Sequence, residues 1–384
     1  MKEQTLAKIN SSVIIFIFCV SIFIPFTTGI IESDKEVSEI EKRKLVLLPK
    51  IPTTIMNIQI FTQLFDNYYS DHFGLRDWFT KYYKLVKYSI GDSPSEDVTI
   101  GKNGWLFLGS AKKGYNKYRD PMGDVRNVNL FSQPELERLA TYMVNLKAWL
   151  NKKGIEYLFI IAPNKHTIYF DQLPNYVSKV NEKSAMDQLV EYLNKHTDVT
   201  IVDLRKSLLK IKDNQQIYFK TDTHWNHYAA NVAQYEIMLK IEQMFPGQIQ
   251  PELKKLFPAV RSGGDLASFI GVDIFTEPFP QPIFEETCEL NIYPENANEI
   301  IDHTVTCNSQ KLNTVIFKDS FFDALEMYFK RKFNRSTYIR ESLNYPSLTK
   351  YIELEKPDIV IEELVERGLP YLPSEIEFNH YIND

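Results

Sequence analysis

The sequence lacks the patterns that mark several common ligand classes. It has only three cysteines in 384 residues, and no His/Cys cluster has the spacing of metal ligands. It has no GxxxxGK[ST] loop for nucleotide phosphates. The net charge is −6 and the lysines and arginines are scattered, whereas nucleic-acid binders usually show a basic stripe. We therefore expect no metal, no cofactor and no nucleic-acid partner.

The N-terminus carries a long stretch without charge. Residues 13–31 contain no charged side chain, and 19 residues can just cross a hydrocarbon layer about 30 Å thick. No small-residue cleavage site is obvious, so we expect an uncleaved transmembrane anchor over 12–31. Lysines precede the run and acids follow it. This predicts a cytoplasmic N-terminus over 1–11, with the rest of the chain on the outer (periplasmic or extracellular) face of the cell membrane.

Two cysteines lie outside the apolar run, at Cys288 and Cys307. In an oxidising compartment they can pair, and a loop of that size would stabilise the fold by about 3 kcal/mol. The alternative is two unrelated free thiols, and the sequence does not decide between them.

The remaining chain divides into a short charged region and a large α/β region. Residues 32–90 form a juxtamembrane linker with two predicted helices, one on either side of Gly74. Residues 91–384 form the main domain, with an irregular insertion at about 246–312. A hairpin is expected over 99–108, with Asn-Gly as its turn. Its predicted helices cover 132–153, 183–196, 226–244 and 321–333, and its predicted strands cover 157–162, 199–202, 314–317 and 358–361.

Strands that alternate with helices predict a parallel sheet with helices on both faces. In such sheets the functional residues lie beyond the carboxyl ends of the strands.

The segment TDTHWN at 221–226 carries the first candidate site. In extended backbone, side chains two positions apart point to the same side, so Asp222 and His224 can meet. The carboxylate would then orient the imidazole and stabilise its protonated form. The alternative is a turn with a hydrogen-bonded histidine.

The second candidate is Ser320, which follows the predicted strand 314–317 and precedes a helix. There its backbone N–H can help to stabilise an oxyanion, and a histidine can take the hydroxyl proton. We expect His224 to be that base. The alternative is a simple helix cap at Asp319-Ser320.

Seven blocks of sequence, in the right order, resemble the alginate O-acetyltransferase family that includes AlgJ and AlgX, and the related DHHW-type proteins. The blocks are EKRKLVLLPK (41–50), FDNYYSDHFGLRDWF (65–79), GKNGWLFLG (101–109), APNKHTIYFDQLP (162–174), TDTHW (221–225), GGDLASFIG (263–271) and FKDSFF (317–322).

The resemblance implies an SGNH-hydrolase-like fold with a circularly permuted motif order, in which the serine follows the Asp/His block. By position, Ser320 would be the nucleophile, His224 the base and Asp222 its orienting acid. The serine would accept an acetyl group from a membrane-bound O-acyltransferase partner and pass it to an exported or cell-surface polysaccharide.

Weaker candidates for the substrate pocket are Trp225, Lys165 and Arg340. Lys165 and Arg340 can also be salt-bridged structural groups, and Trp225 can either stack on a sugar ring or support His224, of which we favour the second. Two alternative functions use the same fold: a surface carbohydrate esterase, and a non-catalytic polysaccharide-binding or assembly protein. The non-catalytic alternative draws on two departures from the family pattern. Lys318 stands where simple hydrolases have glycine, and Phe322 stands where a small residue is usual.

Overall fold

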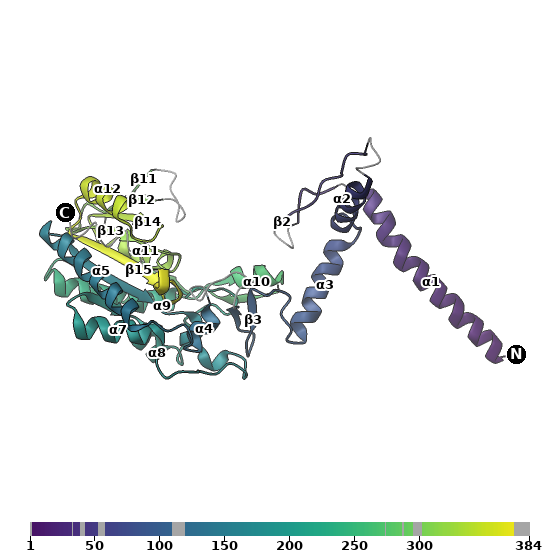
Figure 1. The fold of residues 1–384 in the computed structure, drawn as a ribbon, viewed down its shortest axis with the longest axis horizontal. Coiled ribbons are helices and arrows are strands. Elements are labelled where there is room, and N and C mark those ends of the chain that lie inside the picture. The colour runs from purple at the N-terminus through teal and green to yellow at the C-terminus, as the bar shows by residue number, and fades with distance from the viewer. Residues whose placement is uncertain are drawn as a thin grey trace. The chain divides into compact units, whose positions relative to one another are not determined.

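The computed structural model describes residues 2–32, 34–38, 43–52, 58–109, 120–272, 274–285, 288–294 and 302–371. The chain divides into two compact units. The first comprises residues 1–94 with 269–272, and the second comprises 95–268 with 273–384. Figure 1 labels many of the elements of both units.

The first unit begins with a long apolar helix, α1 (Lys2–Ile31). Its segment Ser12–Gly29 has a mean hydropathy of 2.2 and is long and apolar enough to cross a membrane. A two-stranded ribbon of β1 (Val37–Ser38) and β2 (Arg43–Lys44) follows. Two 14-residue helices complete the unit, α2 (Ile58–Asp71) and α3 (Arg76–Ser89). These are the two helices predicted around Gly74.

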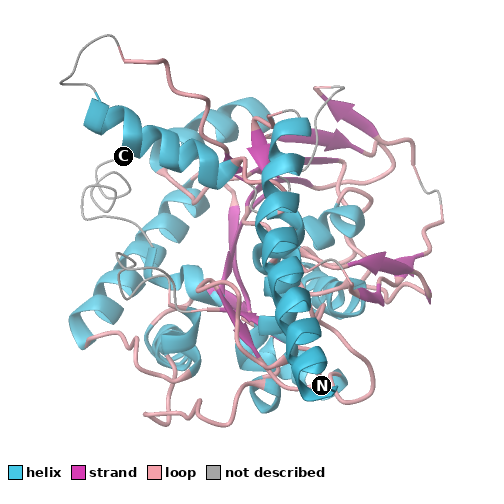
Figure 2. Cartoon of the chain, turned by 90° about the vertical axis from the view of Figure 1, so that its right-hand side faces the viewer, coloured by secondary structure: helices cyan, strands magenta, loops and turns pink. Residues whose placement is uncertain are grey.

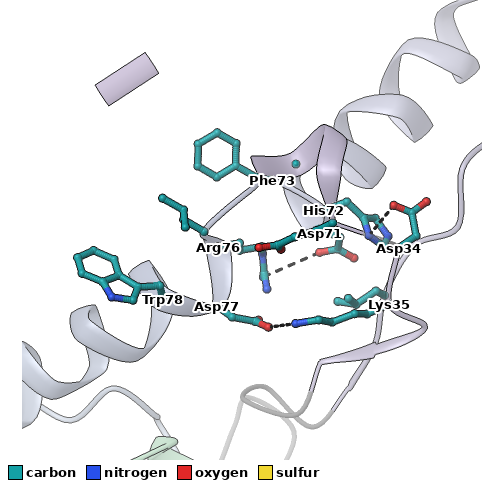
Figure 3. A pocket seen from close by; sticks show the side chains of 12 residues that line it. Asp34, Lys35, Asp71, His72, Phe73, Arg76, Asp77 and Trp78 are labelled. Carbon is teal, nitrogen blue, oxygen red and sulfur yellow. Dashed lines mark hydrogen bonds and ion pairs between the residues drawn. The ribbon is translucent and has the colours of Figure 1, made fainter. Parts of the chain in front are cut away.

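Gly74 joins α2 and α3 and packs against the end of α1. A Cβ atom at Gly74 would lie 2.1 Å from the Pro25 carbonyl oxygen and 2.4 Å from the Gly29 nitrogen, so only glycine fits this contact. Ion pairs also hold the segments after α1 to these helices: Lys35 Nζ lies 2.7 Å from Asp77 (Figure 3), and Arg43 pairs with Asp71. The α2–α3 turn is therefore held on the last turns of α1.

The second unit contains a seven-stranded sheet with the order β11-β12-β14-β13-β15-β5-β6. Five neighbouring strands run parallel, and β12 and β11 complete one edge in antiparallel pairing. The strands are β5 (Glu156–Ala162), β6 (Thr200–Asp203), β11 (Asn291–Tyr293), β12 (His303–Thr306), β13 (Asn313–Phe317), β14 (Arg335–Ile339) and β15 (Ile359–Val365).

Helices cover both faces of this sheet, as predicted. Alternate residues of β5 face opposite ways: Leu158 and Ile160 join one apolar cluster, and Tyr157 and Phe159 join the other. The first cluster includes α8 (Arg205–Ile211), α9 (His227–Met244) and α11 (Asp323–Phe329). The second includes α5 (Gln133–Lys152), α7 (Ala185–His196) and α12 (Tyr345–Glu355). Figure 2 colours the helices cyan and the strands magenta.

Shorter elements connect these layers. They are α4 (Pro121–Val125), α6 (Lys165–Ile168), α10 (Asp265–Ile270), β7 (Leu256–Phe257), β10 (Gln281–Pro282) and the 3₁₀ turns η3 (Phe170–Gln172) and η4 (Glu366–Tyr371). Strands β3 (Val98–Ile100) and β4 (Leu106–Leu108) form the predicted hairpin. Asn103 and Gly104 both have positive φ, as a type I′ turn requires.

The helix predicted over 132–153 is confirmed as α5, and other predictions need correction. Ser132 and Glu135 form the capping box of α5, and Gly154, with φ of 74°, follows its end. The helix predicted over 321–333 is shorter, because the chain turns after Phe329 to enter β14. The insertion predicted at about 246–312 is not wholly irregular, since β11 and β12 extend the main sheet. Its positions 273, 286–287 and 295–301 lie outside the described residues.

Within this region Cys288 and Cys307 form a disulfide. Cys307 is buried beside β12, so the bond fastens the chain before β11 to the sheet edge.

Candidate active site

Ser320 lies in the turn that follows β13, at the carboxyl edge of the sheet. The turn is held by Asp319, whose carboxylate accepts hydrogen bonds from the N–H groups of Phe321 (2.7 Å) and Val365 (2.8 Å). The helix α11 begins only at Asp323, so Ser320 does not start a helix as predicted. The hydrogen bond from Val365 of β15 to the Asp319 carboxylate therefore fixes the turn, where a helix cap had been the alternative.

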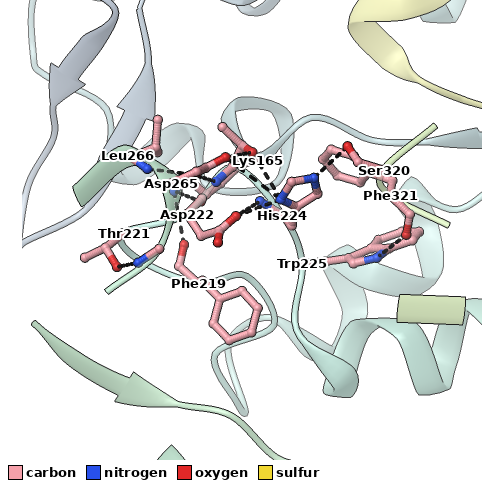
Figure 4. Close-up of polar contacts among 12 residues, drawn as sticks. Lys165, Phe219, Thr221, Asp222, His224, Trp225, Asp265, Leu266, Ser320 and Phe321 are labelled. Carbon is pink, nitrogen blue, oxygen red and sulfur yellow. Dashed lines mark hydrogen bonds and ion pairs between the residues drawn. The ribbon is translucent and has the colours of Figure 1, made fainter. Parts of the chain in front are cut away.

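His224 connects this turn to the TDTHW segment (Figure 4). Its Nε2 lies 2.7 Å from Ser320 Oγ, and its Nδ1 lies 2.7 Å from Asp222 Oδ1. The His224 backbone N–H also donates to Asp222 Oδ1, at 3.0 Å. Nδ1 thus carries a proton toward a carboxylate, which leaves Nε2 as the acceptor for the serine hydroxyl. The structure brings together all three residues that the sequence nominated for catalysis.

Asp222 is buried and held ionised by its neighbours. Burial opposes the charged form, but hydrogen bonds from His224 and the charge of Arg261 outweigh it and hold the pKa of Asp222 well below its usual range. Arg261 donates to Asp222 Oδ2 at 2.8 Å. Both carboxylate oxygens therefore have partners, so the carboxylate cannot rotate freely.

Arg261 is itself positioned by a hairpin of β8 (Val260–Ser262) and β9 (Thr276–Pro278). Arg261 and Glu277 face each other across the two strands, 3.5 Å apart at their charged atoms. The guanidinium stacks 3.4 Å from the centre of the Phe219 ring. Glu277 is buried and accepts hydrogen bonds from the Thr221 hydroxyl and the Lys220 N–H. The hairpin thus holds the loop that carries Asp222.

The loop after β8 approaches Asp222 closely. A Cβ atom at Gly264 would lie 2.3 Å from Asp222 Oδ2, so a side chain at this position would displace the carboxylate. The next residue, Asp265, accepts hydrogen bonds from the Thr223 N–H (2.8 Å) and hydroxyl (2.6 Å). Burial and the nearby charge of Asp222 raise the pKa of Asp265.

Asp222, His224 and Asp265 offer atoms within 4.8 Å of one another, the spacing of a metal site. Their lone pairs are engaged elsewhere, because His224 and Arg261 occupy Asp222 and Thr223 occupies Asp265. The arrangement therefore fits a hydrogen-bonded acid–base pair better than a set of metal ligands.

Lys165 lies beneath the same loop rather than in a substrate pocket. It is 2% exposed, and its ammonium donates to three backbone carbonyls, those of Phe219 (3.0 Å), Lys220 (3.1 Å) and Asp222 (2.7 Å). An ammonium group has three N–H donors and so satisfies all three acceptors. Burial lowers the pKa of Lys165 to about 7. Its place in the structure corrects the prediction of a substrate contact.

Trp225 is likewise behind the site. It is 1% exposed, and its indole N–H donates to the Phe321 carbonyl at 2.9 Å, so it cannot stack on a sugar ring. Phe321 in turn lies against the His224 ring, with 5.0 Å between ring centres. Trp225 therefore ties the turn that bears Ser320 to the segment that bears His224.

Arg340 and Lys318 belong to an ion cluster around α11. Arg340 makes two contacts with the Asp323 carboxylate, at 2.9 and 3.0 Å, and is partly exposed. The buried Lys318 pairs with Asp323 (2.6 Å) and Glu326 (3.1 Å). Phe322 is fully buried and packs on Phe329. Both departures from the family pattern are thus accommodated with Ser320 still in contact with His224.

The sequence did not reveal the roles of Arg261, Asp265 and Glu277, and it indicated Asp319 only as part of a possible helix cap. The block GGDLASFIG had been noted at the position of Gly264 and Asp265, without a role for either. Arg261 and Glu277 lie 39 and 55 positions after Asp222, in a stretch predicted to be an insertion. Only the pairing of β8 with β9 shows that both side chains reach the loop that carries Asp222.

Comparison with known proteins gives matches at low identity. A family model described as "SGNH hydrolase-like domain, acetyltransferase AlgX" matches residues 98–310, more than half of the chain, and ends before Ser320. A "Probable alginate O-acetylase AlgJ" of Pseudomonas aeruginosa is 23% identical over 224 residues, covering 57% of this chain and 52% of that protein. The protein of the same name from Pseudomonas syringae pv. tomato is 24% identical over 236 residues, covering 60% and 56%. The chain thus matches about half the length of these relatives.

Among solved structures, Bacillus cereus PatB1 has a TM-score of 0.49 at 15% identity, over 69% of this chain and 94% of that one. The O-acetyltransferase domain of Pseudomonas putida AlgJ has a TM-score of 0.45 at 17% identity, over 73% and 94%.

Proposed function

This chain belongs to the family of SGNH hydrolase-like AlgX acetyltransferases, and we propose that it transfers acetyl groups to a polysaccharide through an acetyl-serine intermediate on Ser320. The observation that carries the proposal is the hydrogen-bonded series Asp222–His224–Ser320, with both contacts at 2.7 Å. A serine needs such a base, because its hydroxyl is a poor nucleophile at neutral pH.

In the first half-reaction, Ser320 Oγ attacks the acetyl carbonyl of the donor while His224 Nε2 takes the hydroxyl proton. The bond to the leaving group breaks, and His224 returns the proton to that group. In the second half-reaction, a sugar hydroxyl gives its proton to His224 and attacks the acetyl-serine. Ser320 then leaves as its hydroxyl, with the proton from His224. Asp222 stabilises the imidazolium in both halves.

The Ser320 backbone N–H is the candidate oxyanion donor. The neighbouring N–H of Phe321 is already given to Asp319, so it is not available to a substrate. A preorganised donor of this kind is effective because it needs no reorganisation as charge develops.

The relatives' name, alginate O-acetylase, supports a polysaccharide acceptor. The apolar helix α1 supports an anchor in the cell membrane, with residues 1–11 in the cytoplasm and the domain from about residue 91 on the outer face. We further propose that a membrane-bound O-acyltransferase supplies the acetyl group, since both the donor enzyme and this chain would then be held at the same membrane.

An assay in which a sugar and water compete for the acetyl group tests transfer directly. The full chain in detergent is incubated with p-nitrophenyl acetate and one oligosaccharide at a time, derived from alginate, cellulose or chitin. Mass spectrometry then follows oligosaccharides that gain an acetyl group (about 42 Da), and released acetate is measured in parallel. Transfer predicts acetylated sugar at the expense of free acetate. Acetate alone, whatever the sugar, would make the chain an esterase.

Two matched controls separate the chemistry from general effects of substitution. Ser320→Ala and His224→Ala should each abolish acetyl transfer. Ser178→Ala and His196→Ala change the same residue types at exposed positions, and both should leave the rate unchanged. A different result would favour the non-catalytic binding function: the wild type acetylates no oligosaccharide, and Ser320→Ala still binds oligosaccharide as the wild type does.

A further inference from the structure

Helix α3 in the first unit has two unlike faces. Its apolar face carries Trp78, Phe79, Tyr82, Tyr83 and Val86, each of which has another member of the set three or four positions away. All five are between 47% and 62% exposed, and no residue of α3 is buried. In a water-soluble helix such a face would be turned toward a core. The described part of the unit supplies no core for it.

The remaining sides of α3 are cationic. They carry Arg76, Lys81, Lys84 and Lys87 against a single acid of the helix itself, Asp77, which is paired with Lys35 in the segment after α1. Two of these cations also face acids outside the helix: Lys87 pairs with Asp92 at 3.0 Å, and Arg76 lies 3.9 Å from Asp71. On a helical wheel, Lys81 and Lys87 lie at the two borders of the apolar face, where long side chains can extend outward while their stems cover apolar surface.

The depth of α3 follows from its attachment to α1. Gly74 contacts Pro25 and Gly29, at the end of the segment Ser12–Gly29 that is apolar enough to span a membrane. At 1.5 Å per residue, 18 residues extend about 27 Å, close to the thickness of the hydrocarbon layer. Gly74 therefore lies at the level where hydrocarbon gives way to headgroups. Trp78 follows one helical turn later.

We infer that α3 lies in the membrane interface, with its aromatic face in the acyl-chain border and its lysines among anionic lipid headgroups. The inference assumes that α1 spans the membrane, and it does not depend on the chemistry of Ser320. Trp and Tyr concentrate at this level because their rings are apolar with a polar edge. A helix with aromatics on one face and lysines on the other is the pattern of interfacial binding. In Figure 3 the Trp78 ring points away from the Lys35–Asp77 pair.

The chain contains its own fluorescent probe of this contact. It has four tryptophans, and Trp105, Trp149 and Trp225 are at most 5% exposed, whereas Trp78 is 53% exposed. The full chain is reconstituted into vesicles of phosphatidylcholine and phosphatidylglycerol that contain lipid with a spin label near the headgroup or near the chain end. Emission of a Trp78→Phe variant is subtracted, which leaves the signal of Trp78.

Interfacial seating predicts that the shallow spin label removes most of the Trp78 emission, the deep label removes less, and aqueous iodide removes little. Lys81→Glu with Lys84→Glu should reduce quenching by the shallow label, as should vesicles of phosphatidylcholine alone. Trp78 emission that iodide quenches and lipid labels do not would place this face in water. Trp78 emission that neither iodide nor the lipid labels quench would place the aromatic face against protein. Either result overturns the inference. If quenching by the lipid labels is the same with and without phosphatidylglycerol, and the same in the double lysine variant, anionic headgroups have no role.

Discussion

Replacing Lys165 by methionine tests how the acid–base loop is held in position. Methionine keeps most of the side-chain volume and removes the ammonium. The carbonyls of Phe219, Lys220 and Asp222 then lose the ammonium donor. The Lys220 carbonyl still accepts from the Leu106 N–H at 2.8 Å, so two carbonyls are left unsatisfied. An unsatisfied buried polar group costs about 1–3 kcal/mol, so the sum is about 2–6 kcal/mol.

A second effect opposes this loss. Burial lowers the pKa of Lys165 from 10.5 to about 7, and each unit corresponds to about 1.4 kcal/mol, so removal of the buried charge returns about 5 kcal/mol. The two terms largely cancel. The free energy of unfolding of this variant should therefore change little. The substitution should instead shift the Asp222 backbone and side chain, and activity reports that shift.

Activity should respond strongly to that position. A displacement of about 1 Å in a catalytic group can reduce the rate about 100-fold. We expect Lys165→Met to lower kcat/KM for p-nitrophenyl acetate by about that factor, through kcat rather than KM, with thermal unfolding shifted by a few degrees at most.

Lys212→Met is the matched control. Lys212 also donates to a carbonyl, that of Ile168, but it is partly exposed and water can replace it. It should retain wild-type kcat/KM. A folded Lys165→Met protein with wild-type kcat would refute the role of Lys165 in holding the loop.

Three further predictions concern Gly264, Asp124 and the Cys288–Cys307 disulfide. Gly264→Ala should reduce esterase activity sharply because its Cβ would displace Asp222, whereas Gly368→Ala should not, since its Cβ would meet neighbours at ordinary distances of 3.8–4.0 Å; equal activity of the two variants would contradict this. Burial raises the pKa of Asp124 to about 7, so the folded state holds a proton that the unfolded state releases above about pH 4. Stability should therefore fall between about pH 4 and 7, by at most about 4 kcal/mol, and chemical unfolding of Asp124→Asn should show a flatter pH dependence. Replacing Cys288 and Cys307 by serine should lower the free energy of unfolding by about 3 kcal/mol, measured by urea denaturation, and leave kcat unchanged.

Local patterns in the sequence predicted most of the sheet and its helices. Local signals mark two of these elements: the strand predicted at 157–162 is a continuous apolar run, and the helix predicted at 132–153 begins with the capping box of Ser132 and Glu135. Strand β14 and helix α12 were missed, although Asn344 caps α12 and Pro346 lies in its first turn, which is a readable signal. Strands β11 and β12 were not predicted, because they are short and pair with segments distant in the sequence, such as β14 for β12.

The three residues nominated for catalysis came from local motifs and a resemblance. Their supporting residues depend on tertiary contacts instead. Arg261 looked like any surface cation in sequence, and its relation to Asp222 exists only because β8 and β9 pair. Lys165 and Trp225 are candidates in the sequence as well. Their burial decides that they support the site and do not touch substrate, and burial cannot be predicted from adjacent residues in the sequence.

Intact-mass spectrometry of the full chain after incubation with p-nitrophenyl acetate tests the acetyl-serine most directly. Wild-type protein should gain one acetyl group, about 42 Da, located on Ser320 by peptide mapping. Ser320→Ala and His224→Ala should gain none. An adduct that persists in Ser320→Ala, or a folded wild-type protein that neither gains acetyl nor releases nitrophenol, would contradict the proposal that Ser320 is the nucleophile.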